Sequence, residues 1–254
     1  MPISPNTLIH FTKNKENLKS ILIENFKVGY CHEKTTIGGK ETFAYVPMVS
    51  FCDIPLSQIK DHISKYGEYG IGLTREWAVR NKLNPVLYIE QNSLFSQSFM
   101  NATHYFLSQA QQKKSTEFLD DNYFNALLAL GEMRGYIKNY QANLDRKAEI
   151  IQDYRFADER EWRFVPQTND GKQVIMSKER YNSADGVVDK QKLIDVFRLK
   201  FEPNDIKYVI IKEDSEIREF INHLRKAKEK NYSSDDIDRL TTRILTTEQI
   251  KQDI

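Results

Sequence analysis

The sequence VSFCDIPLSQIKDHISKYGEYGIGLT, residues 49–74, changes character twice within a short distance. It begins inside an apolar run, residues 46–53, that predicts a buried strand. The proline at position 55 then suits the first turn of a helix, and residues 69–74 predict a second strand. Apolar side chains recur between the two strands at helical spacing: Leu56, Ile59, Ile63 and Tyr66. This succession indicates a fold that mixes strands with helices.

The rest of the chain extends the mixed pattern. Further strands are predicted at residues 7–12, 86–90, 161–166 and 206–212. The polar residues 31–45 predict a mobile loop, whereas residues 93–152 show helical spacing without a strand pattern. We therefore expect one α+β domain over residues 1–254, with a mixed, largely antiparallel β core and a helical insertion at about 93–152.

Composition limits the class of protein. An apolar content of 40% and an aromatic content of 11% favour a folded chain. The 37 basic residues nearly cancel the 36 acidic ones, so a nucleic acid partner would have to be met by a local patch. Because no window approaches the roughly 18 to 20 apolar residues of a membrane span, we expect no membrane partner.

The cysteines and histidines predict neither a metal site nor a secreted protein. Cys31 and Cys52 are far apart, and the five histidines form no paired ligand spacing with them, so zinc is not expected. The opening MPISPNTLIHF lacks the pattern of a signal peptide, and we expect a cytoplasmic location. Cys52 is expected to pack as a small apolar residue.

Three groups of residues are candidates for a binding site. His10 lies on the first strand, where its ring should point away from the side chains of its neighbours, and a histidine at a sheet face needs no function. Tyr66 and Tyr69 stand among glycines, a combination that suits a planar ligand. A tight helix-to-strand turn packed by aromatic rings is the structural alternative for this second group.

The third group, DEREWRFVP at residues 158–166, carries the most reactive side chains. In a strand, Glu159, Glu161 and Arg163 share one face, which places a carboxylate beside a guanidinium. Such a carboxylate accepts a hydrogen bond from a sugar hydroxyl or stabilises positive charge at an anomeric carbon. The alternative is an exposed ion pair that contributes about 0 to 1 kcal/mol.

Four segments together resemble the AbiGi family of bacterial abortive-infection phage-resistance proteins. They are LIHFTKNKENLKSIL, VPMVSFCDIPLSQIKDHISKYGEYGIGLTREWA, NPVLYI and ADEREWRFVP, and they extend the resemblance over about residues 8–212. Members are usually described as the antitoxin-like half of a two-gene system. The resemblance therefore implies a protein partner, the cognate toxin or antitoxin from the same operon.

The layout of the candidate residues is also similar to that of ADP-ribosyltransferase folds, including those that modify nucleic acid. This resemblance implies NAD as a substrate, with Glu161 and Tyr69 in catalytic roles. It implies NAD-binding roles for four further residues: His10, Ser50, Tyr66 and Arg163. Which tyrosine contacts nicotinamide stays open, as does the choice between Glu159 and Glu161. The sequence has no GxGxxG segment that follows a strand and opens a helix, so a Rossmann mode of NAD binding is not predicted.

Three functions follow as hypotheses from these resemblances. The first is transfer of ADP-ribose from NAD to a macromolecule such as nucleic acid. The second is a non-enzymatic antitoxin that binds and neutralises a toxin encoded beside it. The third is a nucleotide-sensing module that binds a ligand in the same pocket without turnover.

Overall fold

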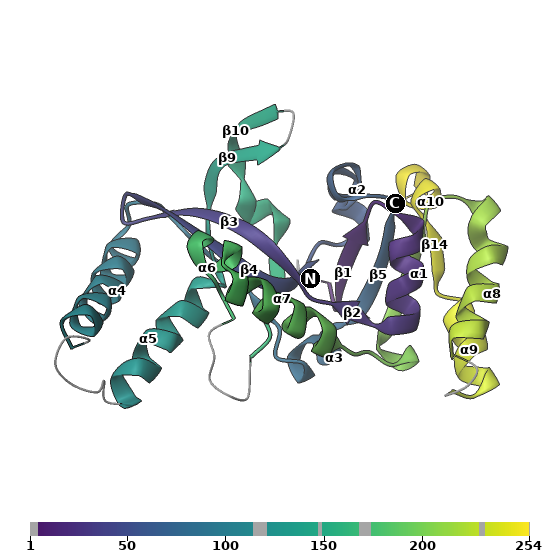
Figure 1. Cartoon of the computed structure of the whole chain (residues 1–254). Coiled ribbons are helices and arrows are strands. Elements are labelled where there is room, and N and C mark those ends of the chain that lie inside the picture. Colours follow the sequence, from purple (N-terminus) through teal and green to yellow (C-terminus); the bar gives the residue numbers. More distant parts are fainter. Residues whose placement is uncertain (1–4, 114–120, 147–148, 168–173, 229–231, 254) are drawn as a thin grey trace.

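A largely antiparallel sheet of eight strands carries the fold in the computed structural model, which describes residues 5–113, 121–146, 149–167, 174–228 and 232–253 (Figure 1). The strand order is β14-β13-β5-β1-β4-β11-β6, and β3 pairs with β4 outside this path. The strands are β1 (Thr7–Thr12), β3 (Gly29–Ile37), β4 (Lys40–Cys52), β5 (Tyr69–Thr74), β6 (Asn84–Pro85), β11 (Glu161–Phe164), β13 (Ile206–Ile211) and β14 (Ile244–Thr246). This arrangement confirms the mixed α+β class.

Helices and short strand pairs surround the sheet. The helices are α1 (Lys15–Glu24), α2 (Lys60–Tyr66), α3 (Arg75–Arg80), α4 (Leu94–Lys113), α5 (Asp121–Arg134), α6 (Lys178–Asn182), α7 (Ala184–Val196), α8 (Ile217–Lys228), α9 (Ser234–Thr241) and α10 (Thr247–Asp253). The short strands pair as β2 (Phe26–Lys27) with β12 (Arg198–Leu199), β7 (Leu87–Ile89) with β8 (Ile137–Asn139), and β9 (Gln141–Arg146) with β10 (Glu149–Arg155). Within the described ranges, no helix has both the length and the apolar character to cross a bilayer.

The unit predicted from residues 49–74 is confirmed as the succession β4, α2, β5. Strand β1 lies between its two strands and pairs antiparallel with both. The pairing with β5 is complete, from Thr7 opposite Thr74 to Thr12 opposite Tyr69. The pairing with β4 is a single register position, Ile9 opposite Cys52. The sheet is therefore continuous on one side of β1 and only narrowly joined on the other.

Successive side chains of a strand point to opposite faces of the sheet, so neighbouring residues of these strands pack in two different cores. Phe51 belongs to the main core, which also buries Trp77 of α3. Cys52 faces the other side and packs in a smaller cluster with Ile63 of α2 and Ile250 of α10. Cys52 thus packs as a small apolar residue, as expected.

The prediction of a mobile loop at residues 31–45 is wrong, because this segment forms most of the β3–β4 hairpin. Nine register pairs join the strands. Gly38 and Gly39 form the turn, and their φ angles of 57° and 74° suit a two-residue loop of type I′. The hairpin extends away from the centre of the sheet towards α4 (Figure 1). Much of the hairpin is exposed, so many of its strand positions carry polar side chains. The sequence therefore lacks the apolar alternation that predicts a strand.

The predicted helical insertion is also corrected in its second half. Helices α4 and α5 occupy residues 94–113 and 121–134, but β8, β9 and β10 follow where no strand was expected. These strands are short, and the mixed polar sequences of β9 and β10 give no apolar alternation. Residues 114–120 and 147–148 of the predicted insertion lie outside the described residues.

Gly67, at the end of α2, provides a test of how this helix meets β1. Its φ is 121°, and an added Cβ would lie 2.3 Å from the Thr12 carbonyl oxygen. Gly67→Ala should therefore lower the free energy of unfolding by about 3 kcal/mol, through backbone strain and a clash with backbone atoms. Urea denaturation would measure this loss. Gly29→Ala is the matched control, because its Cβ would meet nothing within 4 Å. Equal stability of the two variants would contradict the close approach of α2 to β1.

Candidate functional site

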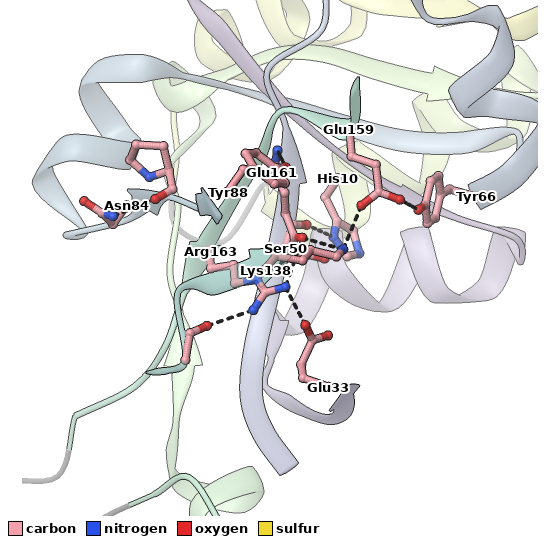
Figure 2. Close-up of polar contacts among 12 residues, drawn as sticks. His10, Glu33, Ser50, Tyr66, Asn84, Tyr88, Lys138, Glu159, Glu161 and Arg163 are labelled. Carbon is pink, nitrogen blue, oxygen red and sulfur yellow. Dashed lines mark hydrogen bonds and ion pairs between the residues drawn. The ribbon is translucent and has the colours of Figure 1, made fainter. Parts of the chain in front are cut away.

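A cavity of about 210 Å³ opens where β1, β4 and β11 meet below α2. Six of its polar lining residues come from distant parts of the chain: His10, Ser50, Tyr66, Lys138, Glu159 and Glu161. Figure 2 shows these side chains converging from β1, β4, α2, β8, β11 and the turn that precedes β11. The cavity thus gathers four of the residues predicted from the sequence, together with Glu159 and with Lys138, which was not predicted.

His10 bridges the narrow join between β1 and β4. Its Nδ1 lies 2.8 Å from the Ser50 carbonyl oxygen, which can only accept, so Nδ1 carries a proton and donates a hydrogen bond to that oxygen. The ring packs against Phe26 and Phe51, on the face opposite Ile9, as strand geometry predicts. Burial lowers the pKa of His10, although the bond to Ser50 opposes this effect. The imidazole is therefore neutral at pH 7 and keeps Nε2 as an acceptor.

Glu161 and Arg163 share one face of β11, as predicted, and they form a buried pair. Arg163 Nε lies 2.7 Å from Glu161 Oε1, and a second guanidinium nitrogen lies 3.0 Å from Oε2. Arg163 also donates to Glu33 of β3 and to the Gly135 carbonyl oxygen, each at 2.8 Å. Arg163 is 1% exposed, so it supports Glu161 from below the cavity instead of lining it. The pair is buried, and the alternative of an exposed ion pair is wrong.

Lys138 links the Glu159 carboxylate to the Glu161 carboxylate, because it forms an ion pair with each. Its Nζ lies 2.8 Å from Glu159 Oε2 and 3.0 Å from Glu161 Oε2. Burial alone would raise the pKa of Glu161, but the positive charges of Arg163 and Lys138 outweigh this effect and lower the pKa to about 2. The pKa of Lys138 is raised because the two glutamates outweigh its own burial. Glu161 is therefore ionised across the physiological pH range.

Glu159 reaches the cavity by a different route from the one predicted. It ends the 3₁₀ turn η2 (Phe156–Glu159), and Arg160 then adopts a left-handed conformation with a φ of 45° before β11 begins. The Glu159 carboxylate accepts hydrogen bonds from the hydroxyls of Tyr66 and Tyr154. Burial, followed by the Glu159 charge, raises the pKa of Tyr66, which therefore stays a neutral donor.

The structure brings Tyr66 to the cavity and leaves Tyr69 out of it. Tyr69 lies on β5, is 8% exposed in the main core and donates its hydroxyl to Glu216 at 3.0 Å. The Tyr66 ring stacks on His62 with a centroid separation of 4.3 Å. The stacked pair provides the flat surface that the sequence predicted for one of the two tyrosines.

The number of hydrogen bonds that the Glu161 carboxylate already accepts shows what it can still bind. A carboxylate offers about four lone-pair positions, and the hydrogen bonds from Arg163 and Lys138 use three. One position is left for a ligand hydroxyl. Among the residues that the structure describes, no three His, Cys, Asp or Glu side chains gather in a way that could hold a metal ion.

Sequence reasoning did not identify Glu33 or Lys138. Glu33 falls in the segment predicted as a loop, and Lys138 falls in the predicted helical insertion. Both join the site through tertiary pairing, because Glu33 contacts Arg163 and Lys138 contacts Glu161. The sequence around them carries no local signal for this role.

Comparisons with known proteins agree with the sequence resemblance. A family model described as "Putative abortive phage resistance protein AbiGi, antitoxin" matches residues 24–212. A protein named "Abortive phage resistance protein AbiGi", from Lactococcus lactis subsp. cremoris, is 27% identical over 226 residues, which cover 82% of this chain and 89% of the relative. No solved structure matches.

His62 should make stability depend on pH. Burial lowers its pKa from 6.5 to about 4, so between these values the unfolded chain binds a proton that the folded chain does not. This contribution to stability is complete above pH 6.5 and is lost as the pH falls towards 4. Between pH 7 and about 4.5, the wild type should lose roughly 2 to 3 kcal/mol more than His62→Phe. Urea denaturation at both pH values measures the difference, and parallel losses would contradict the burial of His62.

Arg163 should be the most sensitive position of the charge network. Arg163→Met leaves Glu33 and Glu161 without their shared cation, and should cost about 3 to 5 kcal/mol of unfolding free energy. The double variant with Glu161→Gln should lose less, because one unpaired charge is removed. Arg180→Met, which breaks an ion pair with 43% and 37% exposed side chains, should cost under about 1 kcal/mol. Equal losses in the Arg163 and Arg180 variants would contradict the network.

Proposed function

The chain belongs to the AbiGi family of abortive phage resistance proteins, a phage-defence family, and from that premise we propose that it transfers ADP-ribose from NAD to a macromolecule such as nucleic acid. In this proposal the sheet around β1, β4 and β11 is an ADP-ribosyltransferase-like core. The observation that carries it is the ionised Glu161 carboxylate, which lines the same cavity as His10, Ser50 and Tyr66.

The size of the cavity fits one end of NAD. Its volume of about 210 Å³ is below the roughly 300 to 1,000 Å³ of pockets that enclose a whole drug-sized ligand. We assign it to the nicotinamide and its ribose. The stacked rings of Tyr66 and His62 give nicotinamide a flat wall, and His10 Nε2 accepts a hydrogen bond from a ribose hydroxyl.

The charge of the cavity suits the bond that has to break. When the C1′–N bond of NAD breaks, its electron pair leaves with nicotinamide and positive charge develops on the ribose. Glu161 is fixed by Arg163 and Lys138 and needs no reorganisation to stabilise this charge. Its remaining acceptor position binds a ribose hydroxyl, which orients C1′ towards the acceptor.

A second function, that of a non-enzymatic antitoxin, is favoured by one observation. The description of the matching family model includes the word antitoxin. Under this alternative the chain forms a stable complex with a toxin encoded beside it and releases no nicotinamide. Expression of the chain alone would slow host growth if it is a toxic transferase, and would leave growth unchanged if it is an antitoxin.

Glu161→Gln tests the transferase directly. The substitution keeps the shape of the side chain and removes the charge, so nicotinamide release from labelled NAD should fall by about 100-fold or more. The assay is run with and without nucleic acid. Glu216→Gln is the matched control, because its side chain is 12% exposed against 10% for Glu161 and it does not line the cavity.

The control variant, Glu216→Gln, should consume NAD at the wild-type rate. Thermal unfolding of both variants separates a loss of chemistry from a loss of fold. Undiminished NAD consumption by a folded Glu161→Gln variant would remove Glu161 from the mechanism. If wild-type protein consumes no NAD but co-purifies with the product of the neighbouring gene, the antitoxin function is supported instead.

A further inference from the structure

A second cavity, of about 280 Å³, borders the first and shares Glu33 and Lys138 with it. It lies between the β3–β4 hairpin on one side and β9 with η2 on the other. Its remaining lining residues include His32, Lys34, Phe43, Asn143, Asp145 and Phe156. Figure 2 shows Lys138 and Glu33 beside Glu161 and Arg163, so the shared wall is the charge network itself. A group in the second cavity would therefore lie next to the candidate catalytic carboxylates.

The hairpin side of this cavity is an aromatic surface. His32 and Phe43 are stacked, with ring centroids 5.5 Å apart and planes 3° from parallel. Phe43 is 47% exposed, so part of its ring is accessible to a ligand. Lys138 Nζ lies 4.7 Å from the centroid of Phe156 on the opposite side. Exposed, parallel aromatic rings of this kind bind flat ligands by stacking.

The charges around the second cavity are already paired within the protein. Glu33 contacts Arg163 at 2.8 Å, Lys34 contacts Glu41 at 2.8 Å, and Lys138 contacts the two cavity glutamates. Asp145 lies 4.0 Å from Lys34. A charged ligand, such as an arginine side chain, would have to compete with these pairs. A neutral planar ring would not.

The rim supplies the hydrogen-bonding groups that a base edge requires. Asn143 lines the cavity with an amide that has two N–H donors, and its Oδ1 accepts a hydrogen bond from the Asp153 backbone N–H at 3.2 Å. Asp145, with a 58% exposed side chain, adds acceptors. Asparagine and aspartate both pair with the edges of bases, whereas an apolar side chain of a protein ligand would use neither.

We propose that the second cavity is the acceptor subsite and that it takes an unpaired nucleobase of single-stranded nucleic acid, stacked on Phe43. This inference rests on the proposed transferase. In the step, the C1′–N bond of NAD breaks and nicotinamide leaves with the electron pair. A nitrogen of the base then forms the new C1′–N bond, and its proton passes to solvent.

Direct binding tests the subsite without NAD. Fluorescence anisotropy would follow labelled DNA single strands of about 12 nucleotides, one for each base, at fixed salt. Phe43→Ala should weaken binding about tenfold or more, because it removes a stacking partner. Phe43→Tyr keeps the ring and should bind within about threefold of wild type. Phe95→Ala, at 49% exposure and outside both cavities, should bind as wild type does.

A duplex of the same sequence should bind more weakly than the single strand, because its bases are stacked in the helix. Equal binding by wild type and Phe43→Ala would overturn the subsite. So would wild-type protein that binds an arginine- or tyrosine-containing peptide but no oligonucleotide, since the acceptor would then be a protein.

Nicotinamide release separates this inference from the proposed function. Phe43→Ala should keep the wild-type rate of NAD consumption without acceptor and should lose the transfer to oligonucleotide. Absence of NAD consumption by the wild type would overturn the proposed function, whatever the oligonucleotide result. Intact NAD consumption with transfer that does not depend on Phe43 would overturn the subsite alone.

Discussion

The architecture of the site depends on the burial of one guanidinium. Arg163 is 1% exposed, and a charge so far from water is tolerated only when its hydrogen bonds are satisfied. Glu161, Glu33 and the Gly135 carbonyl oxygen provide these bonds. The partners come from β11, from the hairpin and from the residue that follows α5, so one side chain fixes three segments that lie far apart in the sequence. The walls of both cavities are built on those segments.

The sequence predicts the parts of this fold whose pattern is set by burial. Strands β1, β5 and β13 and the second half of β4 are apolar or alternate, and each was expected close to its observed place, whereas the first half of β4 was expected in a loop. Strand β3 and the β9–β10 hairpin were missed because exposed strands have the polar composition of loops. Their pairing is fixed by backbone hydrogen bonds and by a glycine turn, which a hydrophobic pattern does not record.

The same distinction applies to the site. The Glu161–Arg163 pair was predictable because residues two apart on a strand share a face. Lys138 was not, because a residue on a short strand after two helices joins Glu161 only through tertiary structure. The choice between Tyr66 and Tyr69 also needed the structure. Pairing with Thr12 fixes Tyr69 on β5, and its hydroxyl reaches Glu216, while Tyr66 ends α2 above the cavity.

The charge balance of the network assigns different roles to its two sides. Three carboxylates, of Glu33, Glu159 and Glu161, face two cations, of Lys138 and Arg163, so these five side chains carry one net negative charge. In the proposed transferase, positive charge that develops on a ribose in the first cavity would compensate this excess. A neutral base in the second cavity would leave it unchanged, so a stacked acceptor would not compete with the developing cation for the carboxylates. In this proposal both cavities can therefore be filled at once.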